Sequence, residues 1–202
     1  MPQEIETKLR VVQSALGVAS ILEELKRLLA VDEFALRRLR NIYFDTSRLL
    51  LNQHKVALRL REVEGEWLQT LKTQGEVVNG VHRRGEWEWP VTGKQLDVVK
   101  LSELAAWPKD VPIAQLQPVF ETNFDRYLAI IDRADAKVEL ALDVGEIESN
   151  GRRDGIFEIE LELVSGAEQV LFDLSNTLRQ SLPVEAYDCS KAERGYALFK
   201  GK

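Results

Sequence analysis

The sequence contains very little cysteine and histidine. Its 202 residues include one cysteine, Cys189, and two histidines, His54 and His82. A single cysteine excludes an internal disulfide, and these three residues provide none of the ligand spacings that zinc sites use. We therefore expect neither a disulfide-stabilised scaffold nor a zinc protein, and we expect both histidines to be surface or hydrogen-bonded residues.

The sequence also lacks the segments that direct proteins to membranes or leave them disordered. No apolar run approaches the roughly 18 residues of a spanning helix. The N-terminus MPQEIETK does not place a basic start before an apolar run. There is no long block of like charge, internal repeat or low-complexity tract. These absences indicate a globular protein without a membrane partner, and we expect a cytoplasmic location.

Positive charge is not in excess either. The formal net charge is −6, whereas nucleic-acid-binding proteins usually carry a basic excess, so we expect no nucleic-acid partner. The sequence contains no GxxxxGKS or GxxxxGKT motif, which excludes a P-loop as the phosphate-binding element. With 45% hydrophobic and 30% charged residues, a chain of 202 residues is typical of one globular domain.

What the sequence does contain is a repeated alternation of charged and apolar residues. In QEIETKLR, residues 3–10, one face of a strand would carry Glu4, Glu6, Lys8 and Arg10. A similar alternation occurs in four later segments, at residues 56–61, 84–89, 138–144 and 157–163. Most of the predicted strands therefore have one apolar face and one ionic face.

Local patterns predict about eight strands and two or three helices. Leucines at helical spacing behind a possible Ser14 N-cap predict an amphipathic helix over 14–30. Further helices are expected at 94–105 and 167–181, with a short helical connection in TSRLLLNQH at 46–54 and a last turn or short helix in SKAERGYALFK. The expected strands lie at residues 3–10, 34–44, 56–61, 67–75, 82–90, 118–131, 137–144 and 156–164, with a turn at Glu64-Gly65.

Two interpretations fit the alternation. Taken strand by strand, the charged residues are most simply the solvated face of an antiparallel sheet. Over eight strands, the ionic face is almost entirely Glu, Asp, Lys and Arg, which favours an eight-stranded antiparallel barrel with a charged interior and helices packed outside, an α+β fold. Charges inside a barrel need partners. A ligand that is both anionic and bound to a divalent metal would engage bases and carboxylates together.

The same residues resemble a known family. Glu4-Ile5-Glu6-Thr7-Lys8 resembles the ExExK signature of the CYTH superfamily, the triphosphate tunnel metalloenzymes. Other segments resemble the family in the expected order, so that we expect a single CYTH-like tunnel domain over 1–202. The ending SKAERGY is most similar to the bacterial inorganic triphosphatase branch. These other segments are YFDT at 43–46, ALRLR at 57–61, TLK at 70–72, Arg84 with Glu86, Arg126, Asp143 with Gly145, EIELE at 158–162 and SKAERGY at 190–196.

The resemblance implies metal-dependent hydrolysis of inorganic triphosphate to pyrophosphate and phosphate, with Mg²⁺ or Mn²⁺ as cofactor. The metal ligands implied are Glu4, Glu6, Asp143, Glu158 and Glu160. The substrate-binding residues implied are Lys8, Arg59, Arg61, Lys72, Arg126 and Lys191, with Arg84 and Arg194 as additions. The residues expected to be catalytic are Glu4, Glu6, Lys8 and Lys191, and one of the two glutamates is the candidate for directing the attacking water.

Several alternatives remain open from the sequence. A class IV adenylate cyclase or a thiamine triphosphatase would use much the same residues, and a noncatalytic polyphosphate- or nucleotide-binding module or a plain interaction domain would need no catalysis. Oligomeric state is not readable from the sequence. By strand phase, Glu139 and Glu162 also face inward and Arg10 lies inside or at the rim. One interpretation places Glu88 at the surface. Arg133, Arg152 and Arg153 are expected to be loop charges.

Overall fold

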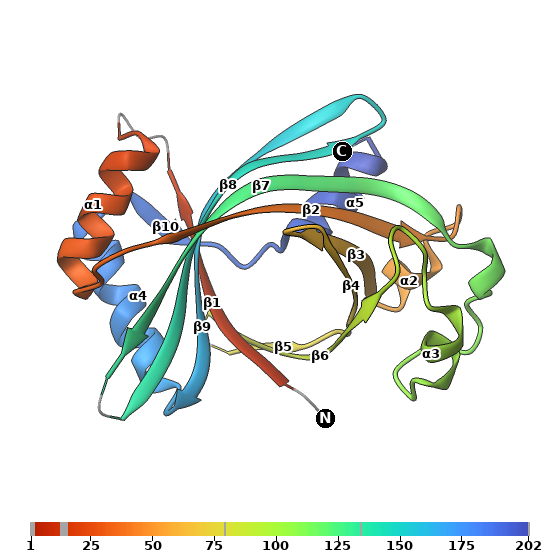
Figure 1. Cartoon of the computed structure of the whole chain (residues 1–202), viewed down its shortest axis with the longest axis horizontal. Helices are drawn as coiled ribbons and strands as arrows, with labels where there is room; N and C mark the ends of the chain where they lie inside the picture. Colours follow the sequence, from red (N-terminus) through yellow and green to blue (C-terminus); the bar gives the residue numbers. More distant parts are fainter. Residues whose placement is uncertain (1–2, 13–15, 79, 134, 202) are drawn as a thin grey trace.

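The computed structural model describes residues 3–12, 16–78, 80–133 and 135–201. Eight of its strands form a closed antiparallel barrel in the order β1-β9-β8-β7-β2-β3-β4-β6, because β1 pairs with β6 as well as with β9. This ring is visible in Figure 1. The barrel strands are β1 (Gln3–Val11), β2 (Ala35–Asp45), β3 (Ala57–Val63), β4 (Glu66–Lys72), β6 (Val81–Val91), β7 (Gln117–Asp132), β8 (Ala136–Ser149) and β9 (Arg152–Gly166). The predicted fold class is confirmed.

Two short strands extend the barrel and the helices lie outside its wall. β5 (Glu76–Val78) pairs with β6, and β10 (Val184–Ala186) pairs with β1. The helices are α1 (Val18–Leu29), α2 (Leu50–Gln53), α3 (Val98–Glu103), α4 (Gln169–Ser181) and α5 (Lys191–Phe199), with a 3₁₀ turn η1 at Ile113–Gln115. No helix within the described ranges is long and apolar enough to cross a membrane.

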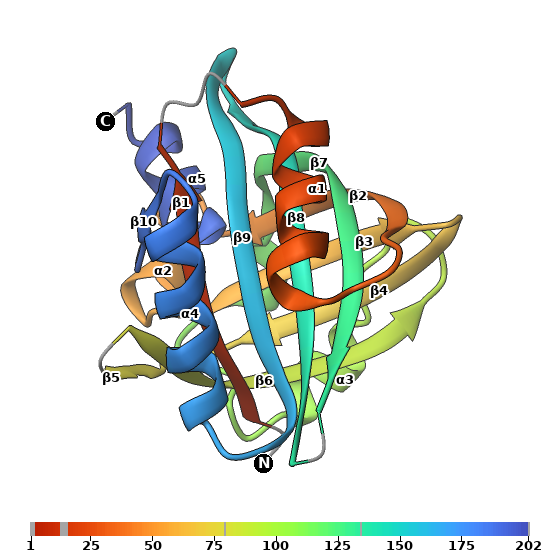
Figure 2. The ribbon, with the colours of Figure 1, turned by 90° about the vertical axis from the view of Figure 1, so that its left-hand side faces the viewer.

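The apolar faces of the strands are buried under the helices. Helices α1 and α4 lie side by side over β1, β9 and β8 (Figure 2). Helix α1 presents Ile21, Leu25 and Leu29, one turn apart, to this layer. Burying side chains of this size stabilises the fold by about 1.5–3 kcal/mol each relative to exposure. A second apolar layer packs α3 against β3, β4 and β6 on the opposite side of the barrel.

A third apolar cluster lies on the inward-facing side of the strands. Tyr43, Phe120 and Phe124 share the strand face of the charged residues and pack with Tyr196 of α5. Tyr43 stacks on Phe120 with ring centroids 4.4 Å apart, and Tyr196 meets Phe120 edge-on at 5.1 Å. Part of the barrel interior is therefore filled by apolar packing against α5, and the remainder carries the charges.

Local predictions needed some correction. Helix α1 starts at Val18, and Ser14, its predicted cap, lies outside the described residues. The second predicted helix is shorter than 94–105, because Asp97 caps its start by accepting a hydrogen bond from the Lys100 amide at 2.9 Å. Of the five α-helices within the described ranges, α1, α3 and α4 lie at the three predicted helices, α2 lies in the expected short helical connection, and α5 lies where a turn or short helix was expected.

Two hairpins show where turn chemistry fixed the strand ends. The predicted turn at Glu64 and Gly65 is present, and both residues have positive φ. Asn150 and Gly151 form a second such turn, so β8 and β9 extend to it. Arg152 and Arg153 therefore begin β9, and the prediction that they are loop charges was wrong.

Candidate active site

Strand register determines which charged residues become neighbours inside the barrel. Arg126 on β7 lies opposite Asp143 on β8, which lies opposite Glu158 on β9. One step along, Glu160 on β9 lies opposite Lys8 on β1. Because directly opposed residues on one face have Cβ atoms about 4.5–5.5 Å apart, acidic and basic side chains are brought into contact around the ring.

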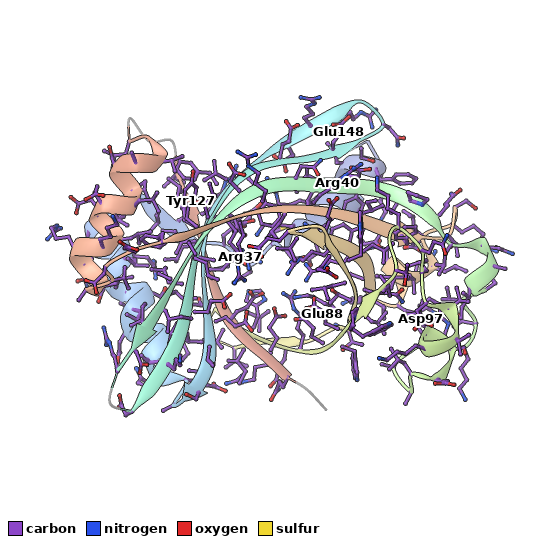
Figure 3. All side chains as sticks on the ribbon, viewed as in Figure 1. Arg37, Arg40, Glu88, Asp97, Tyr127 and Glu148 are labelled. Carbon is purple, nitrogen blue, oxygen red and sulfur yellow. The ribbon has the colours of Figure 1, made fainter. Side chains whose placement is uncertain are left out.

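Lys8, Arg126 and Glu160 line a cavity of about 940 Å³ in the barrel, whereas Asp143 and Glu158 are buried and are not among its described lining residues. Figure 3 shows side chains of the surrounding strands pointing into the opening, with Glu88 at its edge. The acidic lining residues are Glu4, Glu6, Glu76, Glu86, Glu88, Glu139, Glu160, Glu162, Asp188 and Glu193. The basic lining residues are Lys8, Lys55, Arg59, Arg61, Lys72, Arg83, Arg84, Arg126 and Lys191. The expectation that the bore holds the ionised side chains is confirmed.

The most buried charges form a deep cluster of Asp143, Glu158, Glu160, Arg126 and Lys191. Asp143 and Glu158 are 0% and 1% exposed. The Lys191 Nζ lies 2.7 Å from Asp143 Oδ2, 2.7 Å from Glu158 Oε1 and 2.9 Å from Glu160 Oε1. Arg126 donates to both oxygens of Asp143 at 2.8 and 2.7 Å and to Glu160 Oε2 at 2.5 Å. Two cations thus bridge three carboxylates.

Pairing decides the protonation of the deep cluster. Burial alone would lower the pKa of Arg126 and Lys191, but the charges of Asp143 and Glu160 raise both pKa values above their usual range. Burial would raise the pKa of Glu160, but Lys191 and Arg126 hold it well below its usual value. Arg126, Lys191 and Glu160 are therefore charged at neutral pH.

A second group, the first-strand cluster, contains Glu4, Glu6, Lys72, Arg84 and Glu86. Arg84 spans both glutamates of β1, with Nε 2.5 Å from Glu4 Oε2 and Nη2 2.6 Å from Glu6 Oε1. Lys72 Nζ lies 2.8 Å from Glu4 Oε1 and 2.8 Å from Glu86 Oε2. Burial would raise the pKa of Glu4, but Lys72 and Arg84 lower it far below its usual value.

Two arginines of β3 complete the basic wall. Arg59 lies 3.6 Å from Glu86, and Arg61 donates from Nε to Asn41 Oδ1 at 2.9 Å. Burial, together with the charges of Arg59 and Arg126, lowers the pKa of Arg61 to about 10. An incoming anion would offset the repulsion that Arg59 and Arg126 exert on the Arg61 charge.

Helix α5 carries Lys191 into the deep cluster. Ser190 accepts a hydrogen bond from the Glu193 amide at 3.1 Å, and Glu193 accepts one from the Ser190 amide at 2.8 Å, which forms a capping box. Gly195 packs so closely on Phe120 that an added Cβ would lie 2.2 Å from the ring. The SKAERGY segment thus fixes where α5 begins and how near it lies to β7.

The predicted metal ligands lie in two groups, with the Lys8 ammonium between them, 3.9 Å from Glu6 and 3.5 Å from Glu160. Within the described ranges, Asp143, Glu158 and Glu160 offer oxygens within 4.8 Å of one another, whereas Glu4 and Glu6 belong to the first-strand cluster. The five predicted metal ligands are therefore split between two clusters.

Two arginines lie apart from both clusters. Arg194 is buried but pairs with Asp154 at 2.8 Å and donates to the Gly155 carbonyl, and it is not among the described cavity-lining residues. Arg10 is exposed and stacks on the Tyr187 ring at 5.2 Å, which places it beyond the cavity lining.

Several cavity residues were missed or undervalued in the sequence. Glu88, which one interpretation placed at the surface, accepts a hydrogen bond from Thr70 at 2.7 Å and lines the cavity. Tyr43 also lines it; burial would raise its pKa, but the charge of Arg59 lowers it. The pairing of β2 with β3 places Tyr43 opposite Arg59, and alternation within one strand could not have predicted this neighbour.

Glu162 faces the cavity among other acids. It lies opposite Glu6 on β1 and Glu139 on β8. Burial and the negative charges of Glu4 and Glu139 raise the pKa of Glu162 to about 7. No described residue forms an ion pair with Glu162 in the way that Arg84 does with Glu4, so this carboxyl is protonated over part of the neutral range.

The deep cluster has the donors that a hard cation requires. Divalent Mg²⁺ and Mn²⁺ prefer carboxylate oxygens, and three carboxylates are gathered here. Both oxygens of Glu158 are buried and accept no hydrogen bond from the described residues, although the Lys191 Nζ lies 2.7 Å from one of them. An anion without hydrogen bonds suits a cation ligand, so these residues fit a metal ion.

Comparison with known proteins places this site in a family. The model of the CYTH domain matches residues 2–196. The chain belongs to the CYTH family. It is 36% identical over 98% of its length to an inorganic triphosphatase of Haemophilus influenzae, and it spans about half of that curated relative, covering 55% of its length.

Solved structures of other proteins share the fold. A putative adenylyl cyclase from Hippeastrum, described as having a dominant triphosphatase activity, superposes with a TM-score of 0.68 at 21% identity, over 98% of this chain and 95% of that one. A putative adenylate cyclase from Bacillus halodurans gives a TM-score of 0.56 at 23% identity, over 96% and 98% of the two chains. At 21% and 23% identity, these comparisons show only a shared fold.

Proposed function

We propose that this CYTH protein is a metal-dependent hydrolase that converts inorganic triphosphate to pyrophosphate and phosphate. The observation that carries the proposal is one cavity lined by nine bases, with a three-carboxylate cluster beneath it that suits a metal ion. The identity with the inorganic triphosphatase of Haemophilus influenzae supports the same activity. A carboxylate cluster would weaken ligand binding by a module that only binds anions, because its negative charges repel an anionic ligand.

The bases would bind the phosphate oxygens. Charge-assisted hydrogen bonds from arginine and lysine are strong where water is excluded, and they stabilise charge that accumulates on the leaving pyrophosphate. Arg59, Arg61 and Arg126 present guanidinium forks from neighbouring positions of the cavity wall. The predicted substrate-binding residues also include Lys8, Lys72, Arg84 and Lys191, which line the same cavity.

Asp143, Glu158 and Glu160 would hold Mg²⁺ or Mn²⁺, with Glu4 and Glu6 as the further predicted ligands. A bound divalent ion would neutralise phosphate charge and polarise the transferred group. Glu4 keeps a pKa far below its usual value because Lys72 and Arg84 hold it. Glu4 would therefore orient an attacking water as a charged acceptor, and it is a weak proton acceptor itself.

The cavity wall favours an inorganic substrate over a nucleotide or thiamine ester. Its aromatic residues are Tyr43, Phe124 and Tyr196, and each is less than 10% exposed. The described cavity-lining residues therefore present no open aromatic face on which a base or thiazole ring could stack. The absence of a nucleic-acid partner and the cytoplasmic location stay predictions.

The test is phosphate release from tripolyphosphate, ATP and thiamine triphosphate in parallel, with Mg²⁺, Mn²⁺ or EDTA. We expect tripolyphosphate to be the best substrate and EDTA to abolish turnover. Arg59→Ala and Glu6→Ala should each lower kcat/KM at least about 100-fold, in line with the loss of a transition-state contact. The matched control is Arg38→Ala, because the Arg38 side chain is 86% exposed outside the cavity.

Each alternative has its own outcome in this assay. Faster phosphate release from ATP or thiamine triphosphate than from tripolyphosphate would mean that one of those two compounds is the preferred substrate. Tripolyphosphate with Mg²⁺ that raises Tm without releasing phosphate would indicate a noncatalytic binding module. No change in Tm and no phosphate release would leave only an interaction domain, and full activity of Arg59→Ala in EDTA would refute the scheme.

A further inference from the structure

Lys191 occupies the position that a metal ion would take among the carboxylates. Its ammonium lies within 2.9 Å of one oxygen from each of Asp143, Glu158 and Glu160. Oxygens of these three residues lie within 4.8 Å of one another. A divalent cation coordinated by such oxygens sits about 2.0–2.6 Å from each, so it would fill the same space as the ammonium.

Glu158 gives independent support for a cation position. Its side chain is 1% exposed, and neither oxygen accepts a hydrogen bond from the described residues. The ammonium approaches Oε1 at 2.7 Å without satisfying hydrogen-bond geometry. A purely structural ion pair of this depth normally has its lone pairs occupied by hydrogen bonds. A bound metal ion would occupy the lone pairs that Glu158 leaves without a hydrogen bond from the described residues.

We infer that Lys191 is the resident cation of this site and that a divalent metal must displace its ammonium to bind. The inference rests on the proposed function only in that the site is one for a metal. The flexible lysine chain can leave without movement of α5, because Ser190 and Gly195 anchor that helix independently. Lys191 also lines the cavity, so the displaced ammonium has open space within reach.

Displacement would couple the two ligands of the site. The metal replaces Lys191 at the carboxylates, and the released ammonium becomes free to bind a phosphate oxygen. Both events break the same three ion pairs, which need to be broken only once when metal and triphosphate bind together. Linkage then requires each ligand to strengthen binding of the other.

The first test measures the reactivity of Lys191 towards acetic anhydride in the wild-type chain, by peptide mass spectrometry, without any triphosphate. In EDTA the ammonium is held by three carboxylates and its side chain is 9% exposed, so we expect slow acylation. Saturating Mn²⁺ should raise the Lys191 rate about tenfold or more, given typical coupling between sites. Lys200, which is exposed and bonded to Asn52, should react at an unchanged rate and provides the internal reference.

The second test measures Mn²⁺ affinity from the electron paramagnetic resonance signal of free Mn²⁺, again without triphosphate. Lys191→Met should bind Mn²⁺ about tenfold tighter than wild type, or bind it where wild type does not. Lys8→Met is the matched control. It removes the same charge from the same cavity, but the Lys8 ammonium contacts Glu6 and Glu160, at 3.9 and 3.5 Å, and neither Asp143 nor Glu158. Any tightening in Lys8→Met should be clearly smaller than in Lys191→Met, because the Lys8 charge repels the metal from a distance without occupying its position.

Three results would overturn the inference. Saturable Mn²⁺ binding with Lys191 still protected would show that metal and ammonium coexist. Equal tightening in Lys191→Met and Lys8→Met would show a general effect of charge. Failure of both Lys191→Met and wild type to bind Mn²⁺ would show that these carboxylates do not form a metal site. None of these measurements involves hydrolysis, so they stay informative if the proposed activity is wrong.

Discussion

Replacing Arg126 by methionine tests whether the deep cluster is held together by its charge pairing. The Arg126 side chain is 13% exposed and makes three contacts of 2.5–2.8 Å with Asp143 and Glu160. Its loss leaves three carboxylates facing Lys191, with Lys8 at 3.5 Å from Glu160. Removing one partner of a buried ion pair costs about 3–5 kcal/mol. In a domain of this size that corresponds to a fall in Tm of roughly 6–20 °C.

The assay is urea unfolding followed by far-ultraviolet circular dichroism at pH 7.5 in EDTA. Arg38→Met is the control, because Arg38 lies on the neighbouring strand β2, is 86% exposed and pairs with Asp125 at 3.7 Å. Surface pairs of this kind contribute about 0–1 kcal/mol. The double variant Arg126→Met with Asp143→Asn removes a charge of each sign, and it should recover about 0.5–3 kcal/mol relative to additivity.

Two results would refute this reasoning. A loss below about 1 kcal/mol in Arg126→Met would mean that the cluster tolerates an unpaired carboxylate. Strict additivity in the double variant would mean that Arg126 and Asp143 contribute independently, despite two hydrogen bonds of 2.8 and 2.7 Å between them.

Three further predictions concern other parts of the site. The folded pKa of Glu162 is raised to about 7, so its contribution to stability is complete below its unfolded value and is lost as pH rises through 7. Glu162→Gln should stabilise the chain by up to about 3 kcal/mol at pH 8 and hardly at pH 4.5 in urea unfolding, and an equal effect at both values would contradict it. Gly195→Ala should lower the free energy of unfolding by about 1–3 kcal/mol, because the added Cβ would meet the Phe120 ring. The same change should reduce tripolyphosphate turnover by moving Lys191. Unchanged Tm and turnover would show that α5 can shift freely. Tripolyphosphate with Mg²⁺ at about 100 times Kd should stabilise the fold by about 2.7 kcal/mol, visible as a raised Tm that excess EDTA reverses, whereas a Tm that does not respond would exclude tight binding.

Much of the fold could be predicted because side-chain alternation is a local property. Glu158 and Glu160 had to share a face with each other, and so did Arg59 and Arg61, whatever the rest of the chain did. Closure of the barrel by a particular pair of strands could not be predicted from this local alternation. It depends on β1 pairing with β6, where Glu4 lies opposite Arg84, a residue 80 positions away. No local pattern reports such a pairing.

Helical and turn segments were harder to predict, for related reasons. Lys191 and Arg194 both belong to the SKAERGY segment, but the packing of α5 on Phe120 sends Lys191 to the deep cluster and Arg194 to Asp154. The choice depends on which helix face meets the barrel, and that is decided by the shape of both surfaces.

The order of residues along the chain specifies most of the strands and helices, the ionic and apolar faces of the strands and the kinds of charge available to a ligand. Which of these charges meet depends on the three-dimensional arrangement of the strands: Arg84 pairs with Glu4 and Glu6, Lys191 pairs with Asp143, Glu158 and Glu160, and Lys8 lies between Glu6 and Glu160. The physical reason is that the period of a strand fixes the direction of a side chain. Coulomb attraction depends on distance, and register and closure set that distance between strands remote in sequence.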